Sequence, residues 1–186
     1  RPDATFDGAE FGGGDLRVRV ARDGSGARWT RHGRPAGFAS PLALCDGAPV
    51  PMSVVREDAN GVELAGGPVE RLSFRIGDGE IRIELRAREP VTGPSLRLAG
   101  TLEQGLLAGV EHLGHAEASS TTLDLEGPAR VRYEPDPMHL TMPLAAFVTP
   151  EASLAVLWDD PENLRPAFSV PNRYDGTADH IVALKG

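Results

Sequence analysis

The sequence predicts an all-β protein, a large antiparallel β-sandwich with little or no helix. Two observations favour this fold class. Apolar and polar residues alternate with a period of two in several segments, which is typical of strands with one face in water. A helical period of 3.6 residues is sustained nowhere, because Gly or Pro interrupts nearly every window long enough to show it.

Three segments alternate most clearly, and Gly-rich links predict that they form hairpins. Their apolar residues are Leu16, Val18 and Val20, then Leu72, Phe74 and Ile76, then Ile81, Ile83 and Leu85. Gly77-Asp78-Gly79 joins the last two segments, and Asp23-Gly24-Ser25-Gly26 follows the first. Both links contain residues that accept the positive φ of tight turns, so both indicate antiparallel hairpins.

Further strand candidates recur along the chain at the spacing typical of all-β domains. They are residues 38–44, 50–56, 62–64, 96–99, 106–113, 119–125, 131–133, 140–148, 153–158 and 181–184. The segments 140–148 and 153–158 are more continuously apolar than the others, which predicts inner strands covered on both faces.

Length and composition predict one globular domain over residues 1–186. The chain is 40% hydrophobic and 25% charged, and its single Cys45 excludes an internal disulfide and a multi-Cys zinc site. No apolar stretch approaches the roughly 20 residues that a membrane-spanning helix needs, so we expect no membrane partner. The chain starts with Arg and ends in ALKG, which we interpret as a piece of a longer polypeptide.

Charge is unevenly distributed along the chain. Residues 1–97 carry 14 Arg against 14 acidic residues, whereas residues 98–186 carry five basic against 13 acidic residues and hold the whole net charge of −8. A negative field repels phosphate backbones, so nucleic acid is disfavoured as a partner. Neutral polyols or cations fit better.

The segment from Gly109 to Leu125 holds the densest group of proton-transferring and metal-ligating side chains, namely Glu111, His112, His115 and Glu117. Two His three residues apart bind zinc when they lie on one helical turn. The nearby glycines and the Ser/Thr run predict a strand instead, on which such a pair diverges, so we expect no metal there. The four residues remain weak acid–base candidates, and a solvated polar face is the alternative.

The C-terminal loops form a second candidate zone. Aromatic rings beside planar polar side chains are the groups that stack on sugars and pair with their hydroxyls. The candidate ligand-binding residues are Trp158, Asp159, Asn172, Arg173, Tyr174, Asp175 and His180. Calcium bound by the carboxylates is an alternative, and Trp158 capping a strand end is another. No other cofactor is expected.

Several short motifs resemble galactose-mutarotase-like super-sandwich domains. They are Gly109 to Leu113 with Glu117 to Ser120, Arg132 to Pro137, Leu140 to Ala145, Leu157 to Asp159, and Pro171-Asn172. The resemblance covers about residues 105–180. It implies a β-sandwich with a sugar-facing surface, a secreted or periplasmic location, and an adjoining glycosidase or polysaccharide-processing catalytic domain in the same polypeptide.

Three functions are therefore expected from the sequence, in this order. The first is a non-catalytic, carbohydrate-associated module that accompanies a catalytic domain and binds carbohydrate. The second is a sugar-acting enzyme, an aldose epimerase or a hydrolase, that uses the Glu and His candidates as acid and base. The third is a structural or assembly module, which an exposed apolar patch without a polar-lined pocket would indicate.

Overall fold

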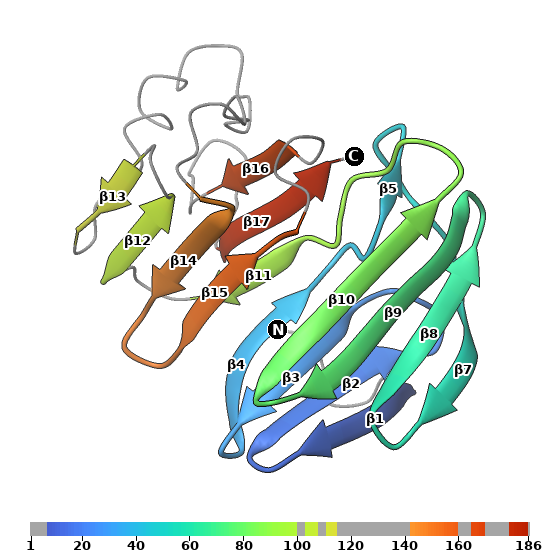
Figure 1. Ribbon diagram of the computed structural model, residues 1–186, viewed down its shortest axis with the longest axis horizontal. Coiled ribbons are helices and arrows are strands. Elements are labelled where there is room, and N and C mark those ends of the chain that lie inside the picture. Colours follow the sequence, from blue (N-terminus) through green and yellow to red (C-terminus); the bar gives the residue numbers. More distant parts are fainter. Residues whose placement is uncertain are drawn as a thin grey trace. The chain divides into compact units, whose positions relative to one another are not determined.

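The computed structural model describes residues 7–99, 103–107, 111–114, 142–159, 165–169 and 179–185. Every regular element in these ranges is a β-strand, and every strand pairing in them is antiparallel, so the predicted all-β, sandwich-like fold class is confirmed. The chain divides into two compact units, residues 1–94 and 95–186 (Figure 1). The expectation of a single domain stays a prediction.

The first unit begins with four strands that pair in chain order. They are β1 (Gly8–Gly13), β2 (Leu16–Ala21), β3 (Ala27–Arg31) and β4 (Arg34–Ala39). The predicted hairpin after β2 is confirmed, and Gly24 in its turn has a φ of +72°. The sequence candidate 38–44 is wrong beyond Ala39, because β4 ends there and Pro41 has no N–H to donate to a ladder.

A second sheet in this unit has the strand order β10-β9-β8-β7. Its strands are β7 (Ser53–Asp58), β8 (Gly61–Gly66), β9 (Val69–Gly77) and β10 (Glu80–Ala87), and a short hairpin of β5 (Leu44–Cys45) and β6 (Ala48–Pro49) precedes it. The predicted hairpin between β9 and β10 is confirmed. Its turn residues Asp78 and Gly79 have φ values of +52° and +77°.

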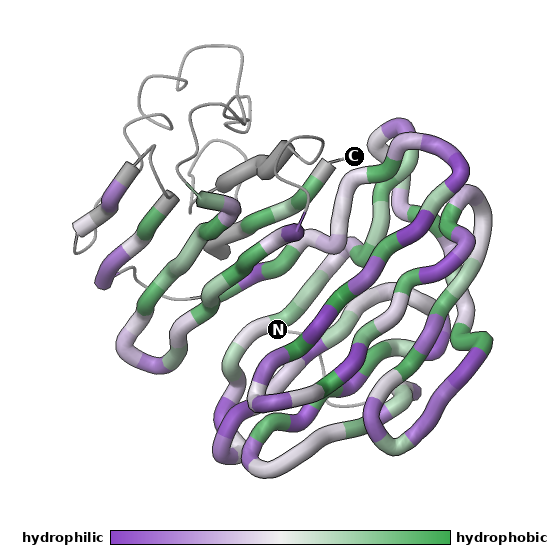
Figure 2. Tube along the Cα trace, viewed as in Figure 1, coloured by the Kyte–Doolittle hydropathy of each residue, from purple (hydrophilic) through white to green (hydrophobic). Residues whose placement is uncertain are grey.

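The core of the first unit is built from the predicted alternation. Apolar and polar residues alternate along β9 and β10 in Figure 2, and the apolar side chains of β2, β8 and β9 are the ones removed from water. On these three strands the apolar side chains with no exposed surface are Val18, Val20, Val62, Leu64, Leu72 and Phe74. On β10 the corresponding residues Ile81, Ile83 and Leu85 are only half-buried.

The second unit also contains two groups of antiparallel strands. One is a sheet of order β13-β12-β14-β15, and in the other β17 pairs with β11 and with β16. The strands are β11 (Leu96–Ala99), β12 (Gln104–Leu107), β13 (Glu111–Leu113), β14 (Leu144–Val148), β15 (Ser153–Leu157), β16 (Arg165–Ser169) and β17 (Asp179–Lys185). Among the buried residues here are Ala145, Phe147, Val156 and Val182.

Two predictions about this unit are wrong. The candidate strand 106–113 is not one strand, because β12 and β13 are separate and pair with each other. The segment 153–158 is not covered on both faces, because burial alternates along β15 and Leu157 is 74% exposed. The candidates 119–125 and 131–133 lie outside the described residues. The described part of the chain has no helix of the length and apolarity that a membrane span needs.

Candidate functional site

The acid–base candidates of the sequence are only partly described. Glu111 and His112 lie on β13, opposite Leu107 and Leu106 of β12, and His112 is exposed. The expected strand, rather than the helix of a zinc motif, is therefore confirmed for Glu111–Leu113. His115 and Glu117 lie outside the described residues. In the ranges that the structure describes, no three His, Cys, Asp or Glu side chains gather as a metal ion requires.

The predicted sugar-binding zone is described at three positions. Trp158 follows β15, is 5% exposed, and its indole Nε1 is buried without a hydrogen-bond partner among the described residues. A ring buried to this degree packs in the core, which favours the alternative of a strand-end cap, and sugar binding by Trp158 stays a prediction. Asp159 is exposed, and the backbone of His180 pairs with Leu98. The other candidates, Asn172, Arg173, Tyr174 and Asp175, lie outside the described residues.

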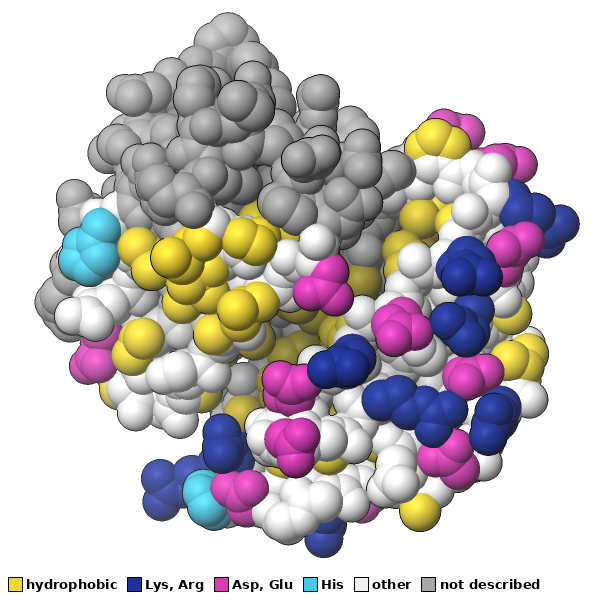
Figure 3. All heavy atoms as spheres, in the orientation of Figure 1, with side chains coloured by type: hydrophobic (Ala, Val, Ile, Leu, Met, Phe, Trp, Pro, Cys, Tyr) yellow, Lys and Arg dark blue, Asp and Glu magenta, His cyan; other side chains and the backbone are white. Residues whose placement is uncertain are grey.

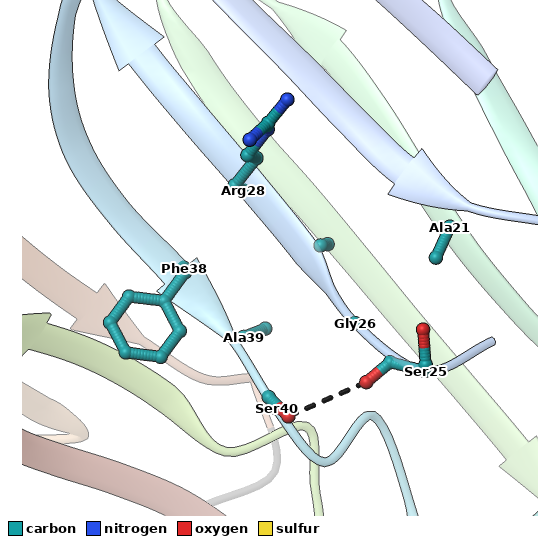
Figure 4. A pocket seen from close by; sticks show the side chains of 8 residues that line it. Ala21, Ser25, Gly26, Arg28, Phe38, Ala39 and Ser40 are labelled. Atoms are coloured by element: carbon teal, nitrogen blue, oxygen red, sulfur yellow. Dashed lines mark hydrogen bonds between the residues drawn. The ribbon is translucent and has the colours of Figure 1, made fainter. Parts of the chain in front are cut away.

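A small pocket lies in the first unit, between the turn after β2 and the end of β4. Figure 4 shows Arg28 and Phe38 at its wall, and the Ser40 hydroxyl donates a 3.4 Å hydrogen bond to the Ser25 carbonyl oxygen beside it. Its volume is about 110 Å³, whereas pockets that bind small molecules have volumes of ~300–1,000 Å³. This pocket therefore does not qualify as a sugar or substrate site.

The outer face of the sheet β7 to β10 carries a network of ion pairs. Arg75 on β9 donates to Asp58 on β7 at 2.7 Å and to Glu63 on β8 at 3.0 Å. The hydrogen bond from Arg75, followed by that from the backbone N–H of Asn60, lowers the pKa of the Asp58 carboxyl below its ordinary value. Arg71 donates to Glu84 at 3.2 Å on the same face.

This network is a structural surface rather than a catalytic centre. Its acids and bases are paired with each other, and most of the side chains are more than one third exposed. A carboxyl that acts as a general acid at neutral pH needs a raised pKa, whereas the pKa of Asp58 is lowered. The same holds for Asp15, whose pKa the Arg31 hydrogen bond lowers.

The sheet of the second unit has an apolar face that is open to solvent. Leu157 on β15 is 74% exposed and lies opposite Leu144 on β14, and Ala155 lies opposite Ala146. Figure 3 shows hydrophobic side chains gathered over β12, β14 and β15. We call this surface the apolar face; its residues are Leu106, Leu144, Ala146, Val148, Ser153, Ala155 and Leu157. None of these seven side chains is charged or aromatic, and the exposed residues His112, opposite Leu106, and Gln104, opposite Val148, border them on the same face.

The apolar segments that form this surface can be recognised in the sequence, but their pattern predicts strands that are covered on both faces. The apolar continuity of 140–148 and 153–158 predicts two covered faces, yet β14 and β15 have one buried row and one row reached by solvent. No family model, curated protein or solved structure matches this chain.

Proposed function

We propose that this chain is a non-catalytic assembly module that docks onto an uncharged, aliphatic protein surface through the apolar face. The observation that carries the proposal is Leu157, which is 74% exposed at the end of the edge strand β15, beside Leu144 of β14. Monomeric proteins rarely leave contiguous apolar area in water without a partner to cover it. Removing such area from water is worth roughly 25 cal/mol per Å² before the entropic cost of association is subtracted.

The chemistry of the apolar face favours protein over carbohydrate as its partner. Sugar recognition uses aromatic rings and planar polar side chains. The seven residues of the apolar face include neither, and only at its border do His112, opposite Leu106, and Gln104, opposite Val148, present such groups. The face is also uncharged although residues 98–186 hold the net charge of −8. Contact there therefore removes no carboxylate from water, a step that costs several kcal/mol when the charge is left unpaired.

Carbohydrate association and sugar-acting catalysis remain proposals that rest on the resemblance of the sequence alone. The described residues bring together no acid–base pair in a pocket, and the residues on which these functions depend lie mostly outside the described ranges. Carbohydrate binding is tested separately by the polysaccharide gels described below.

The experiment uses octyl-agarose as an aliphatic probe of the apolar face. We expect Leu157→Ser to elute earlier than the wild-type protein. Val55→Ser is the matched control, because Val55 is 62% exposed but lies on β7 in the first unit. Retention that drops equally for both variants would overturn the assignment of the apolar face.

The same proteins are then run through gels that contain neutral polysaccharides. We expect unchanged mobility in every gel. Retardation of the wild-type protein by a polysaccharide, with Leu157→Ser behaving alike, would replace the proposal by a carbohydrate-binding function.

A further inference from the structure

β10 forms an edge of its sheet and has the composition of a strand that can pair with itself. The sheet order is β10-β9-β8-β7, so β10 has a neighbour on one side only among the described strands. It is eight residues long, Glu80–Ala87. An edge strand directs every second N–H and C=O away from its neighbour and can accept another strand there.

The side chains of β10 form two different rows. Glu80, Arg82, Glu84 and Arg86 are exposed and alternate in the sign of their charge. Ile81, Ile83 and Leu85 are half-buried, and they lie opposite Ile76, Phe74 and Leu72 of β9, so they continue the apolar row of the core. A strand added at this edge would extend both rows.

We propose that β10 pairs antiparallel with β10 of a second copy of this chain, about a twofold axis at Ile83. In this register Arg82 lies opposite Glu84 of the second copy, and Glu80 lies opposite Arg86 of the second copy. The twofold axis repeats both pairs, which gives four oppositely charged pairs. Ile81 meets Leu85 and Ile83 meets its own copy, so the apolar rows also match.

Neighbouring registers do not have this complementarity. A twofold axis at Arg82 or at Glu84 places like charges opposite each other, such as Glu80 and Glu84 in the first case, and like charges directly opposite destabilise a sheet. A shift by one residue places apolar side chains opposite charged ones on the wrong face. The alternating charges of β10 therefore disfavour the neighbouring registers and favour antiparallel pairing with its own copy about Ile83.

The charged pairs define the register more than they strengthen the dimer. The side chains of Arg82, Glu80 and Glu84 are 69%, 61% and 57% exposed, and exposed pairs contribute little. The main-chain hydrogen bonds and the joined apolar rows supply the attraction. One strand per copy buries less area than a standard interface, so we expect a dimer that dissociates on dilution.

The test is a charge exchange followed by sedimentation velocity over a range of protein concentrations. Arg82→Glu places two acids opposite each other twice in the dimer, and Glu84→Arg does the same with two bases. We expect each single variant to lower the association constant about tenfold or more. Combining both in one chain restores opposite charges, so the double variant is expected to dimerise like the wild type.

Mixing the two single variants provides a second readout. Arg82→Glu in one copy then faces Glu84→Arg in the other, and both contacts are attractive, so we expect a mixed dimer to form where neither variant dimerises alone. Arg56→Glu is the control, because Arg56 is an exposed residue on the opposite edge strand β7. It is expected to leave association unchanged. Thermal unfolding of each variant checks that the fold is kept.

Four outcomes would overturn this inference. A wild-type protein that stays monomeric at every concentration has no such dimer. Single variants that associate like the wild type, or a mixture that forms no mixed dimer, show that β10 is not the interface. Self-association that Leu157→Ser abolishes and Arg82→Glu leaves intact assigns the contact to the apolar face instead, without affecting the proposed function.

Discussion

The guanidinium of Arg75 on β9 reaches across the intervening strand β8 and lies 2.7 Å from the carboxylate of Asp58 on β7. Gly61 makes this reach possible. It lies opposite Arg75 in one pairing and opposite Asp58 in the other, and it has no side chain to occupy the space between them. A contact between strands that are not neighbours thus depends on a glycine in the strand that separates them.

Asp58→Asn is expected to lower the free energy of unfolding at pH 7, because it removes the charged partner of Arg75. Since Arg75 lowers the pKa of folded Asp58, the pair stabilises the fold above the ordinary carboxyl pKa of 3.8. This stabilisation is lost as the pH falls below 3.8 through the lowered pKa. Urea midpoints of both proteins at several pH values measure the difference, which should close in acid.

Asp78→Asn is the matched control for this comparison. Asp78 lies in the turn after β9 with a φ of +52°, a conformation that Asn accepts, and its carboxyl forms no ion pair in the described part of the chain. The same loss of charge is therefore expected to leave the urea midpoint nearly unchanged. A difference between Asp58→Asn and wild type that persists below the titration range would contradict the ion-pair explanation.

Gly61→Ala is expected to destabilise the first unit by about 1–3 kcal/mol, as overpacking does. A Cβ there would lie 2.8 Å from Arg75 Cδ and would also meet the carbonyl oxygen of Phe74. Gly77→Ala is the control, because no described residue lies within 4 Å of its Cβ position. Chemical denaturation of both variants measures the contrast, and equal stabilities would show that β8 yields to the extra methyl group.

The effects of Phe147→Ala and Leu157→Ala on the free energy of unfolding distinguish the buried row from the exposed row of the second unit. Phe147 is 1% exposed, so its loss leaves a cavity and is expected to cost about 3–5 kcal/mol of unfolding free energy. Leu157 is 74% exposed, and its truncation is expected to change stability by less than about 0.5 kcal/mol. A large loss of stability for Leu157→Ala would mean that Leu157 is part of the core and not of a docking surface.

Trp29→Phe leaves Trp158 as the only tryptophan and so makes its surroundings measurable by fluorescence. Trp158 is 5% exposed, so we expect blue-shifted emission and weak quenching by acrylamide. Neutral sugars are expected to change neither. Emission that shifts when a sugar is added would restore Trp158 as a ligand-binding residue.

The strands of the first unit could be predicted well because their signal is local. The alternation over Leu72 to Ile76 and the turn at Asp78 are read from a few consecutive residues, and both appear in β9 and β10. The hairpin of β12 and β13 was missed because the apolar pattern of 106–113 continues across the point where the chain reverses. An apolar pattern does not itself mark a turn.

The candidate site could be predicted far less well. In the sequence, Trp158 beside Asp159 predicts two exposed ligand-binding residues. In the structure the Trp158 ring is buried, and only Asp159 is exposed. Conversely, the residues around Leu157 are apolar and were expected inside. Which face of a strand is covered depends on what packs against it, and no pattern within the strand contains that information.

The sequence by itself determined the class of this protein, because a period of two and tight-turn residues act between neighbours in the chain. It also determined the charge alternation of β10, which is a property of successive residues. Only the tertiary structure decided that β10 is an edge, that Asp58 meets Arg75, and that one face of β14 and β15 stays in water. These depend on strand order and sheet packing, which join residues far apart in the chain through contacts that local propensity does not encode.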